Sequence, residues 1–195
     1  MKIRIKIQGA LVFLGLGAII LFSSYLLPGR RNGILDYALD TIGIALILFG
    51  FLFRISARGY KEEKSDNSDT LVKDGPYAII RNPMYLGTFM IGAGVVMMLL
   101  ELWFIFLFVG IFLLIYIPQI KKEEVMLLKK FGQEYKEYCK ITPKYFPRVD
   151  YLLRLNKYVS LKSFWVKKEI VSMIATLTIV ILLEIWKYAR LFGYK

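Results

Sequence analysis

The sequence contains no histidine and a single cysteine, Cys139, among 195 residues. The absence of histidine excludes a histidine general base, a histidine-based catalytic triad and histidine-ligated metal sites. One cysteine can form neither an intrachain disulfide nor a multi-cysteine metal site. The sequence also lacks a G-x-G-x-x-G segment between a strand pattern and a helix pattern, so a Rossmann-type nucleotide site is excluded. We therefore expect no metal and no classical nucleotide-binding fold.

Acidic residues are scarce: 15 Asp and Glu stand against 27 Lys and Arg, which gives a net charge of +12. A basic balance can indicate nucleic-acid binding or membrane topology. Here the basic residues flank apolar blocks of about 17–20 residues, the length that crosses a bilayer core of ~30 Å. They form no separate basic domain, so we expect the lipid bilayer as a partner and no nucleic acid. The oligomeric state stays open.

The apolar blocks predict an all-α fold: an integral membrane bundle of about five transmembrane helices plus a cytoplasmic amphipathic helix. We interpret the first block as a retained helix, because its apolar run is too long for a typical signal peptide. The stretch Arg58–Asp74 is polar and is predicted to be a loop. Pro118 is predicted to end the fourth span, ahead of an amphipathic helix over Lys121–Cys139. The five predicted spans are 9–27, 35–55, 83–100, 102–117 and 170–186.

Basic residues also predict the orientation of these spans. With the N-terminus inside, 22 of the 27 Lys and Arg fall on the inner side and 5 on the outer side. Such a bias places the polar loop and the amphipathic helix in the cytoplasm. We expect a single membrane domain over 1–195, with two N-terminal spans (1–57), a core with a helical hairpin (58–148) and a basic segment with a C-terminal apolar helix (149–195).

Two segments at the predicted cytoplasmic boundary carry groups suited to chemistry. The first is LVKDGPYAIIRNPMYLG, Leu71–Gly87, in which Gly75 and Pro76 form a turn and Arg81 directly precedes a helix start. The N-terminus of that helix favours an anion such as a carboxylate. The second segment is Lys121–Glu124, where paired acids follow the fourth span. Together they offer cationic, anionic and aromatic groups around one opening.

These segments resemble the signature of the isoprenylcysteine carboxyl methyltransferase and phospholipid methyltransferase superfamily. Its pattern is similar to LV-x-x-G-P-Y-x-x-x-R-H-P-x-Y, then a transmembrane hairpin, then E-E-x-x-L-x-x-x-F-G-x-x-Y-x-x-Y and a proline-containing tail. The first part is matched by Leu71, Val72, Gly75, Pro76, Tyr77, Arg81, Pro83 and Tyr85. The second part is matched by Glu123, Glu124, Leu127, Phe131, Gly132, Tyr135, Tyr138, Pro143 and Pro147.

The resemblance implies a methyltransferase that binds S-adenosylmethionine between the cytoplasmic loop and the helix after the hairpin, and that acts on a lipophilic or lipid-tailed substrate. It implies that Glu123 binds the amino group of the cofactor's methionine moiety. Candidate catalytic residues are Arg81, which would orient an anionic group, Gln119 beside the substrate, and Glu124 as a proton acceptor. The remaining residues implied to bind the cofactor are Asp69, Thr70, Leu71, Val72, Tyr77, Asn82, Pro83, Met84 and Tyr85.

Two positions depart from the family pattern. Asn82 stands where the family has histidine, and it keeps hydrogen-bonding capacity but cannot become cationic. Gln119 stands where carboxyl-methylating members tend to carry arginine, so a charged clamp on a substrate carboxylate is missing. These departures leave open a non-enzymatic membrane protein that keeps the fold. A further alternative is an NADPH-dependent membrane reductase of the sterol-reductase type, whose tail the segment Tyr138–Lys140, followed by a proline, faintly resembles.

Overall fold

The computed structural model describes residues 34–64, 70–99, 101–147, 149–152 and 154–193, and every regular element among them is a helix. Within the described residues, three helices are long and apolar enough to cross a membrane: α3, α6 and the Glu169–Trp186 part of α9. Helix α5 is apolar but shorter. The prediction of an all-α membrane bundle is confirmed, whereas the predicted first span, 9–27, lies outside the described residues. The helices are α3 (Ile34–Lys64), α4 (Pro76–Ile79), α5 (Pro83–Leu99), α6 (Phe104–Ile141), α7 (Val149–Leu152), α8 (Leu155–Tyr158) and α9 (Ser163–Gly193).

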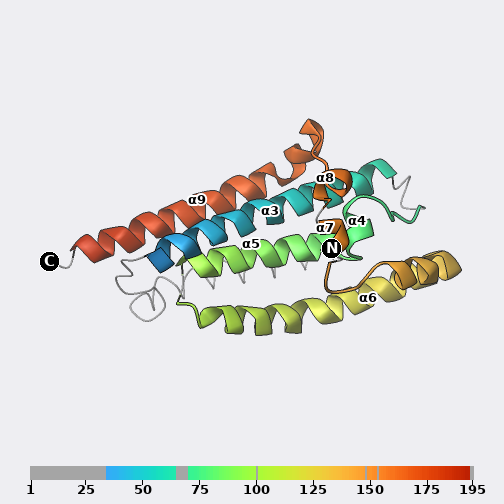
Figure 1. Cartoon of the computed structure of the whole chain (residues 1–195), viewed down its shortest axis with the longest axis horizontal. Coiled ribbons are helices and arrows are strands. Elements are labelled where there is room, and N and C mark those ends of the chain that lie inside the picture. The colour runs from blue at the N-terminus through green and yellow to red at the C-terminus, as the bar shows by residue number, and fades with distance from the viewer. Residues whose placement is uncertain (1–33, 65–69, 100, 148, 153, 194–195) are drawn as a thin grey trace.

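Helices α3 and α5 lie side by side and run antiparallel (Figure 1). They touch along a seam of glycines. Gly43 faces Gly94, and Gly50 faces Gly87, so both helices place glycine at a seven-residue spacing on one face. A Cβ atom added at Gly50 would lie 2.6 Å from the carbonyl oxygen of Gly87, and one added at Gly87 would lie 2.6 Å from the carbonyl oxygen of Gly50. Such close backbone approach is how helices pack tightly in lipid, where the hydrophobic effect between helices is weak. The seam fixes the register of α5 against α3.

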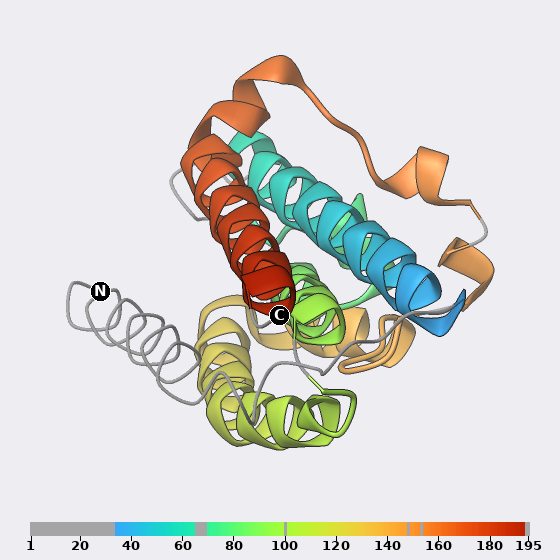
Figure 2. The same cartoon turned by 90° about the vertical axis from the view of Figure 1, so that its left-hand side faces the viewer.

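Helix α6 packs on the side of α5 that faces away from α3 (Figures 1 and 2), and it joins the predicted fourth span and the predicted amphipathic helix into one element. A short turn after residue 100 joins α5 to α6, so the predicted hairpin is confirmed. A Cβ at Gly92 would meet the ring of Phe108, which explains the small residue there as helix packing.

The prediction that the fourth span ends at Pro118 was wrong, because α6 stays helical through Pro118. A proline costs a helix one backbone hydrogen bond and a local kink, and the contacts of α6 on both sides of Pro118 offset that cost. Non-helical torsion occurs at Gly132, where φ is +53°.

The predicted loop Arg58–Asp74 is also partly helical, because α3 continues to Lys64. Trp165 of α9 holds this extension: its ring lies directly on Gly59, where an added Cβ would clash at 1.9 Å. The Trp165 indole N–H donates to Glu63, which also pairs with Lys162. The long polar run at the end of α3 is therefore stabilised by tertiary contacts that its composition does not reveal.

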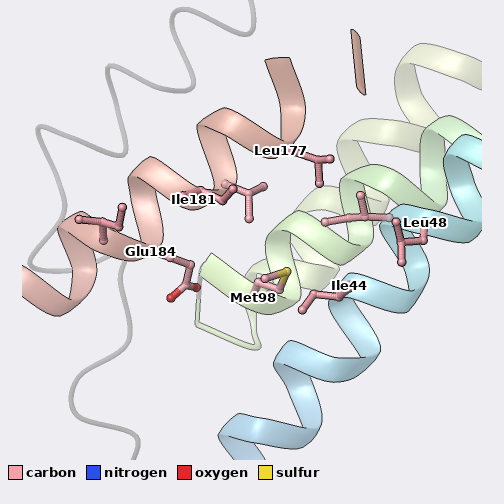
Figure 3. Close-up of a pocket in the computed structure, with 9 residues that line it drawn as sticks. Ile44, Leu48, Met98, Leu177, Ile181 and Glu184 are labelled. Atoms are coloured by element: carbon pink, nitrogen blue, oxygen red, sulfur yellow. The ribbon is translucent and has the colours of Figure 1, made fainter. Parts of the chain in front are cut away.

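Helix α9 lies against α3 and, with fewer contacts, against α5 (Figure 2). It contains the predicted fifth span, 170–186, and starts seven residues earlier. Between the three helices is a cavity of about 560 Å³, lined almost wholly by aliphatic side chains (Figure 3). Met98 in that lining marks the C-terminal end of α5. The cavity therefore lies at the other end of α5 from the segments that carry the candidate chemistry.

Candidate active site

The turn before α4 is shaped by Gly75. Its φ of +61° suits glycine, and an added Cβ would lie 2.6 Å from the ring of Tyr60. The turn directs Tyr77 toward the second half of α6, where the Tyr138 hydroxyl donates to the Tyr77 carbonyl over 2.7 Å. Burial raises the pKa of the Tyr77 phenol above its ordinary value, and the nearby charge of Glu123 adds to the shift. Tyr77 is thus a neutral phenol close to an acidic group.

The segment between α4 and α5 is held by the chain that follows α6. The backbone N–H of Arg81 donates to the carbonyl of Pro143 over 3.0 Å. Asn82 caps the start of α5, since its carbonyl accepts the N–H groups of Tyr85 and Leu86. Two buried donors in this segment have no hydrogen-bond partner within the described part of the chain: Nε of Arg81 and Nδ2 of Asn82. Buried donors are normally satisfied, so these two mark a place for an acceptor.

Arg81 forms a charged cluster with α6. Its Nη1 donates to Oε1 of Glu124 over 2.9 Å and to Sγ of Cys139 over 3.0 Å. The second oxygen of Glu124, Oε2, accepts from Nζ of Lys144. The side chains of Arg81, Glu124 and Lys144 are 15–20% exposed, so solvent screens these contacts less than it would on the surface. The cluster joins the start of α5, the middle of α6 and the segment after α6.

Glu123, the next residue on α6, is held by neutral donors. Its Oε1 accepts the Tyr85 hydroxyl over 2.6 Å and the Gln119 amide over 2.8 Å. Tyr85 comes from the first turn of α5, so this contact brings the two parts of the sequence motif together. The ring of Tyr85 also meets Tyr116, which stacks on Phe112 at 4.1 Å. An aromatic surface thus leads from the polar groups into the apolar part of the α5–α6 hairpin.

The structure brings together most of the residues singled out in the sequence. Arg81, Gln119, Glu123 and Glu124 lie in two adjoining hydrogen-bonded groups at the start of α5. Pro83 is buried, and Met84 is partly exposed beside it. Leu71 is buried against Tyr135 and Tyr138 of α6, Val72 is partly exposed, and Thr70 is exposed. Asp69 lies outside the described residues.

Three further contacts were not anticipated from the sequence. Lys144 pairs with Glu124, and Cys139 accepts a hydrogen bond from Arg81. Tyr116 supports Tyr85 from within the hairpin. In the predicted amphipathic helix, the three- and four-residue spacing of apolar residues predicts a packed face of Val125, Leu128, Phe131, Tyr135 and Tyr138. That prediction was wrong in part, because Val125 and Leu128 are exposed. The face that packs is Leu127, Phe131, Tyr135 and Tyr138. The sequence did not predict Lys144 at the site, because this residue follows the end of α6 and the direction of the chain beyond that end cannot be read from the sequence.

These features define a class: a helical membrane protein with an ionic and aromatic site where a transmembrane hairpin meets a polar boundary. A comparison with family models places the chain within that class. Residues 39–134, about half of the chain, match the model of the phospholipid methyltransferase family. This stretch of the chain belongs to that family, within the superfamily of isoprenylcysteine carboxyl and phospholipid membrane methyltransferases. The family indicates methyltransferase activity on lipid-type substrates.

The match begins within α3 and ends in the second half of α6, so it covers all of α5 and both glutamates of the site. Helix α9 lies beyond it. No curated protein and no solved structure matched the chain.

Proposed function

We propose that this protein is an S-adenosylmethionine-dependent methyltransferase that acts on a lipophilic or lipid-tailed substrate at the cytoplasmic membrane face, in the manner of isoprenylcysteine carboxyl methyltransferases. One observation carries the proposal. The Tyr85–Glu123 hydrogen bond of 2.6 Å and the Arg81–Glu124 ion pair of 2.9 Å join the two halves of the motif at the start of α5. The four residues that form these two contacts all lie within the family match, residues 39–134.

The chemistry of the donor set suits the methionine end of the cofactor, which carries an ammonium and a carboxylate. Glu123 is a carboxylate within a partly buried site, and it would bind the ammonium through a charge-assisted hydrogen bond. The unpartnered donors Nδ2 of Asn82 and Nε of Arg81 would meet the carboxylate, beside the N-terminus of α5. The ammonium of the cofactor would thus face a carboxylate, and its carboxylate would face hydrogen-bond donors. The amide of Asn82, which stands in place of the family's histidine, supplies a hydrogen-bond donor but no positive charge.

The adenosine part would lie against the segment before α5. Leu71, Val72 and Tyr77 provide apolar and aromatic surface there, and Pro83 and Met84 continue it into the helix. Asp69 and Thr70 belong to the same proposed set. The Tyr138–Tyr77 hydrogen bond fixes this segment on α6, so the surface is preorganised before the cofactor binds.

When bound, the cofactor supplies a methyl group on a sulfonium, which is a strong electrophile. The protein then needs mainly to align the acceptor and to keep water out, and positioning alone can supply much of the rate. We assign Gln119 to the acceptor side, since its amide already lies on Glu123. Both oxygens of Glu124 face a cation, which suits it to fixing Arg81 more than to accepting a proton. A proton released by an amine acceptor would pass to water.

The substrate would enter sideways from the bilayer, along the α5–α6 hairpin. Its tail would stay in lipid beside the aromatic surface of Tyr85, Tyr116 and Phe112, and its head group would reach Arg81 and Gln119. This route fits a multi-pass protein whose site faces the cytoplasm. The orientation rests on the 22 of 27 basic residues that the five-span arrangement places inside.

Binding of radiolabelled S-adenosylmethionine and of NADPH to the purified protein tests the proposal. We expect saturable binding of S-adenosylmethionine that its demethylated product displaces, and no NADPH binding. Binding of NADPH alone would identify a reductase and overturn the proposal. Binding of neither would leave a non-enzymatic membrane protein with a methyltransferase fold.

A further inference from the structure

Glu169 of α9 is a buried carboxylate inside the bundle, with 1% of its surface exposed. Two arginines of α3 hold it. Arg54 donates through Nε and Nη2 over 3.2 Å, and Nη1 of Arg58 lies 2.8 Å from Oε1. A buried charge costs several kcal/mol unless it is paired and hydrogen-bonded, and these two arginines supply that pairing for Glu169.

Arg54 also reaches α5 with its remaining amino group. Nη1 donates to the hydroxyl of Thr88 over 2.6 Å, and that hydroxyl donates to the carbonyl of Met84 over 2.9 Å. The stem of Arg54 crosses α5 at Gly87, where a Cβ would lie 2.7 Å from its Cγ. The guanidinium is therefore fixed between α9 and the first two turns of α5, the part of α5 that carries the proposed cofactor contacts.

Helix α9 lies beyond the residues that match the family, whereas α3 and α5 lie within them. We propose that Glu169 is a positioning residue for the methyltransferase site: through Arg54 and Thr88 it sets the first turns of α5 and thereby the affinity for the methyl donor. The inference rests on the proposed function. On this proposal α9, which lies outside the matched residues, contributes to cofactor binding. Glu169 contributes only through Arg54 and Thr88 and does not itself contact the substrate.

The chain offers a matched control. Glu63 also joins α3 to α9, through Lys162 and the indole of Trp165, and among the described residues its hydrogen bonds and ion pairs do not involve α5. If Glu169 only docks α9 on α3, then Glu63→Gln and Glu169→Gln should behave alike. If Glu169 acts through Arg54 on α5, the two variants should differ in the KM for S-adenosylmethionine.

We expect Glu169→Gln to raise the KM for S-adenosylmethionine about tenfold with kcat within about twofold, and Glu63→Gln to change neither by more than about twofold. Thr88→Val, which keeps the shape but breaks the link to Met84, should raise the same KM about fivefold. The double variant Glu169→Gln/Thr88→Val should be no worse than Glu169→Gln alone, since both changes break one chain of contacts. Glu169→Asp should recover part of the lost affinity.

Equal effects of Glu169→Gln and Glu63→Gln, or fully additive effects of Glu169→Gln and Thr88→Val, would overturn the inference. A wild-type KM in Thr88→Val would also overturn it, and that variant serves if Glu169→Gln does not fold. Wild-type protein that binds no S-adenosylmethionine would instead refute the proposed function, so the two failures are distinguishable.

Discussion

Replacing Glu123 by glutamine isolates the charge in the proposed cofactor contact. A glutamine side chain has the same shape, and its amide oxygen can still accept from Tyr85 and Gln119, which now lie 2.6 and 2.8 Å from Oε1. The local structure should therefore survive. A hydrogen bond to a charged group is worth about 1.5–3 kcal/mol and a neutral one about 0.5–1.5 kcal/mol. The difference, about 1–2 kcal/mol, corresponds to about a 5- to 30-fold loss of affinity.

Titration calorimetry in detergent with two ligands checks this reasoning. S-adenosylhomocysteine carries the ammonium, whereas 5′-methylthioadenosine lacks the whole amino-acid end. Glu123→Gln should lower the affinity for S-adenosylhomocysteine about 5- to 30-fold. The same substitution should change the affinity for 5′-methylthioadenosine by no more than about twofold. Glu134→Gln is a suitable control, because Glu134 forms an exposed ion pair with Lys73. Equal losses for both ligands, or no loss for either, would remove Glu123 from the ammonium site.

Three further predictions follow from the fold and the site. If the methyl acceptor is a carboxylate, Gln119→Arg should raise activity on a prenylcysteine analogue. If the acceptor is an amine, the same substitution should lower activity on an aminophospholipid. Methylation of neither compound, with intact cofactor binding, would contradict a lipid substrate. Gly87→Ala should destabilise the protein by about 1–3 kcal/mol, measured by thermal unfolding in detergent, because its Cβ would meet the carbonyl of Gly50; an unchanged melting temperature would refute the close seam. Glu62→Cys in a Cys139→Ser background should resist an impermeant thiol reagent applied outside intact cells, and efficient labelling would reverse the proposed orientation.

The sequence predicted the parts of the fold that depend on local chemistry. Proline at position 83 marks the start of α5, and uninterrupted apolar residues predict the α5–α6 hairpin. The two motif segments were expected around one opening, and the Tyr85–Glu123 contact brings them there. These predictions succeeded because each depends on residues close together in the chain or on a pattern of fixed spacing.

The predictions that were wrong concern segments whose structure is decided by distant partners. The run after Arg58 is polar enough for a loop, yet Trp165 binds it a hundred residues later and keeps it helical. Pro118 is a helix breaker by local rules, yet α6 continues through it. The Glu169 cluster was missed as well, although a signal existed: Arg54 and Arg58 are spaced four apart on one helix, and an acid borders the last apolar run.

The continuity of α6 links the site to the thickness of the bilayer. At about 1.5 Å per residue, Glu123 lies about 16 Å along the helix from Phe112, with no break in helical torsion between them. A thinner or thicker membrane changes the tilt of such a helix, and the two glutamates move with it. The start of α5 is held to α3 by the glycine seam, so a change in the tilt of α6 would act on the Tyr85–Glu123 and Arg81–Glu124 contacts. We therefore expect the lengths of the surrounding acyl chains to affect the contacts between the two halves of the site.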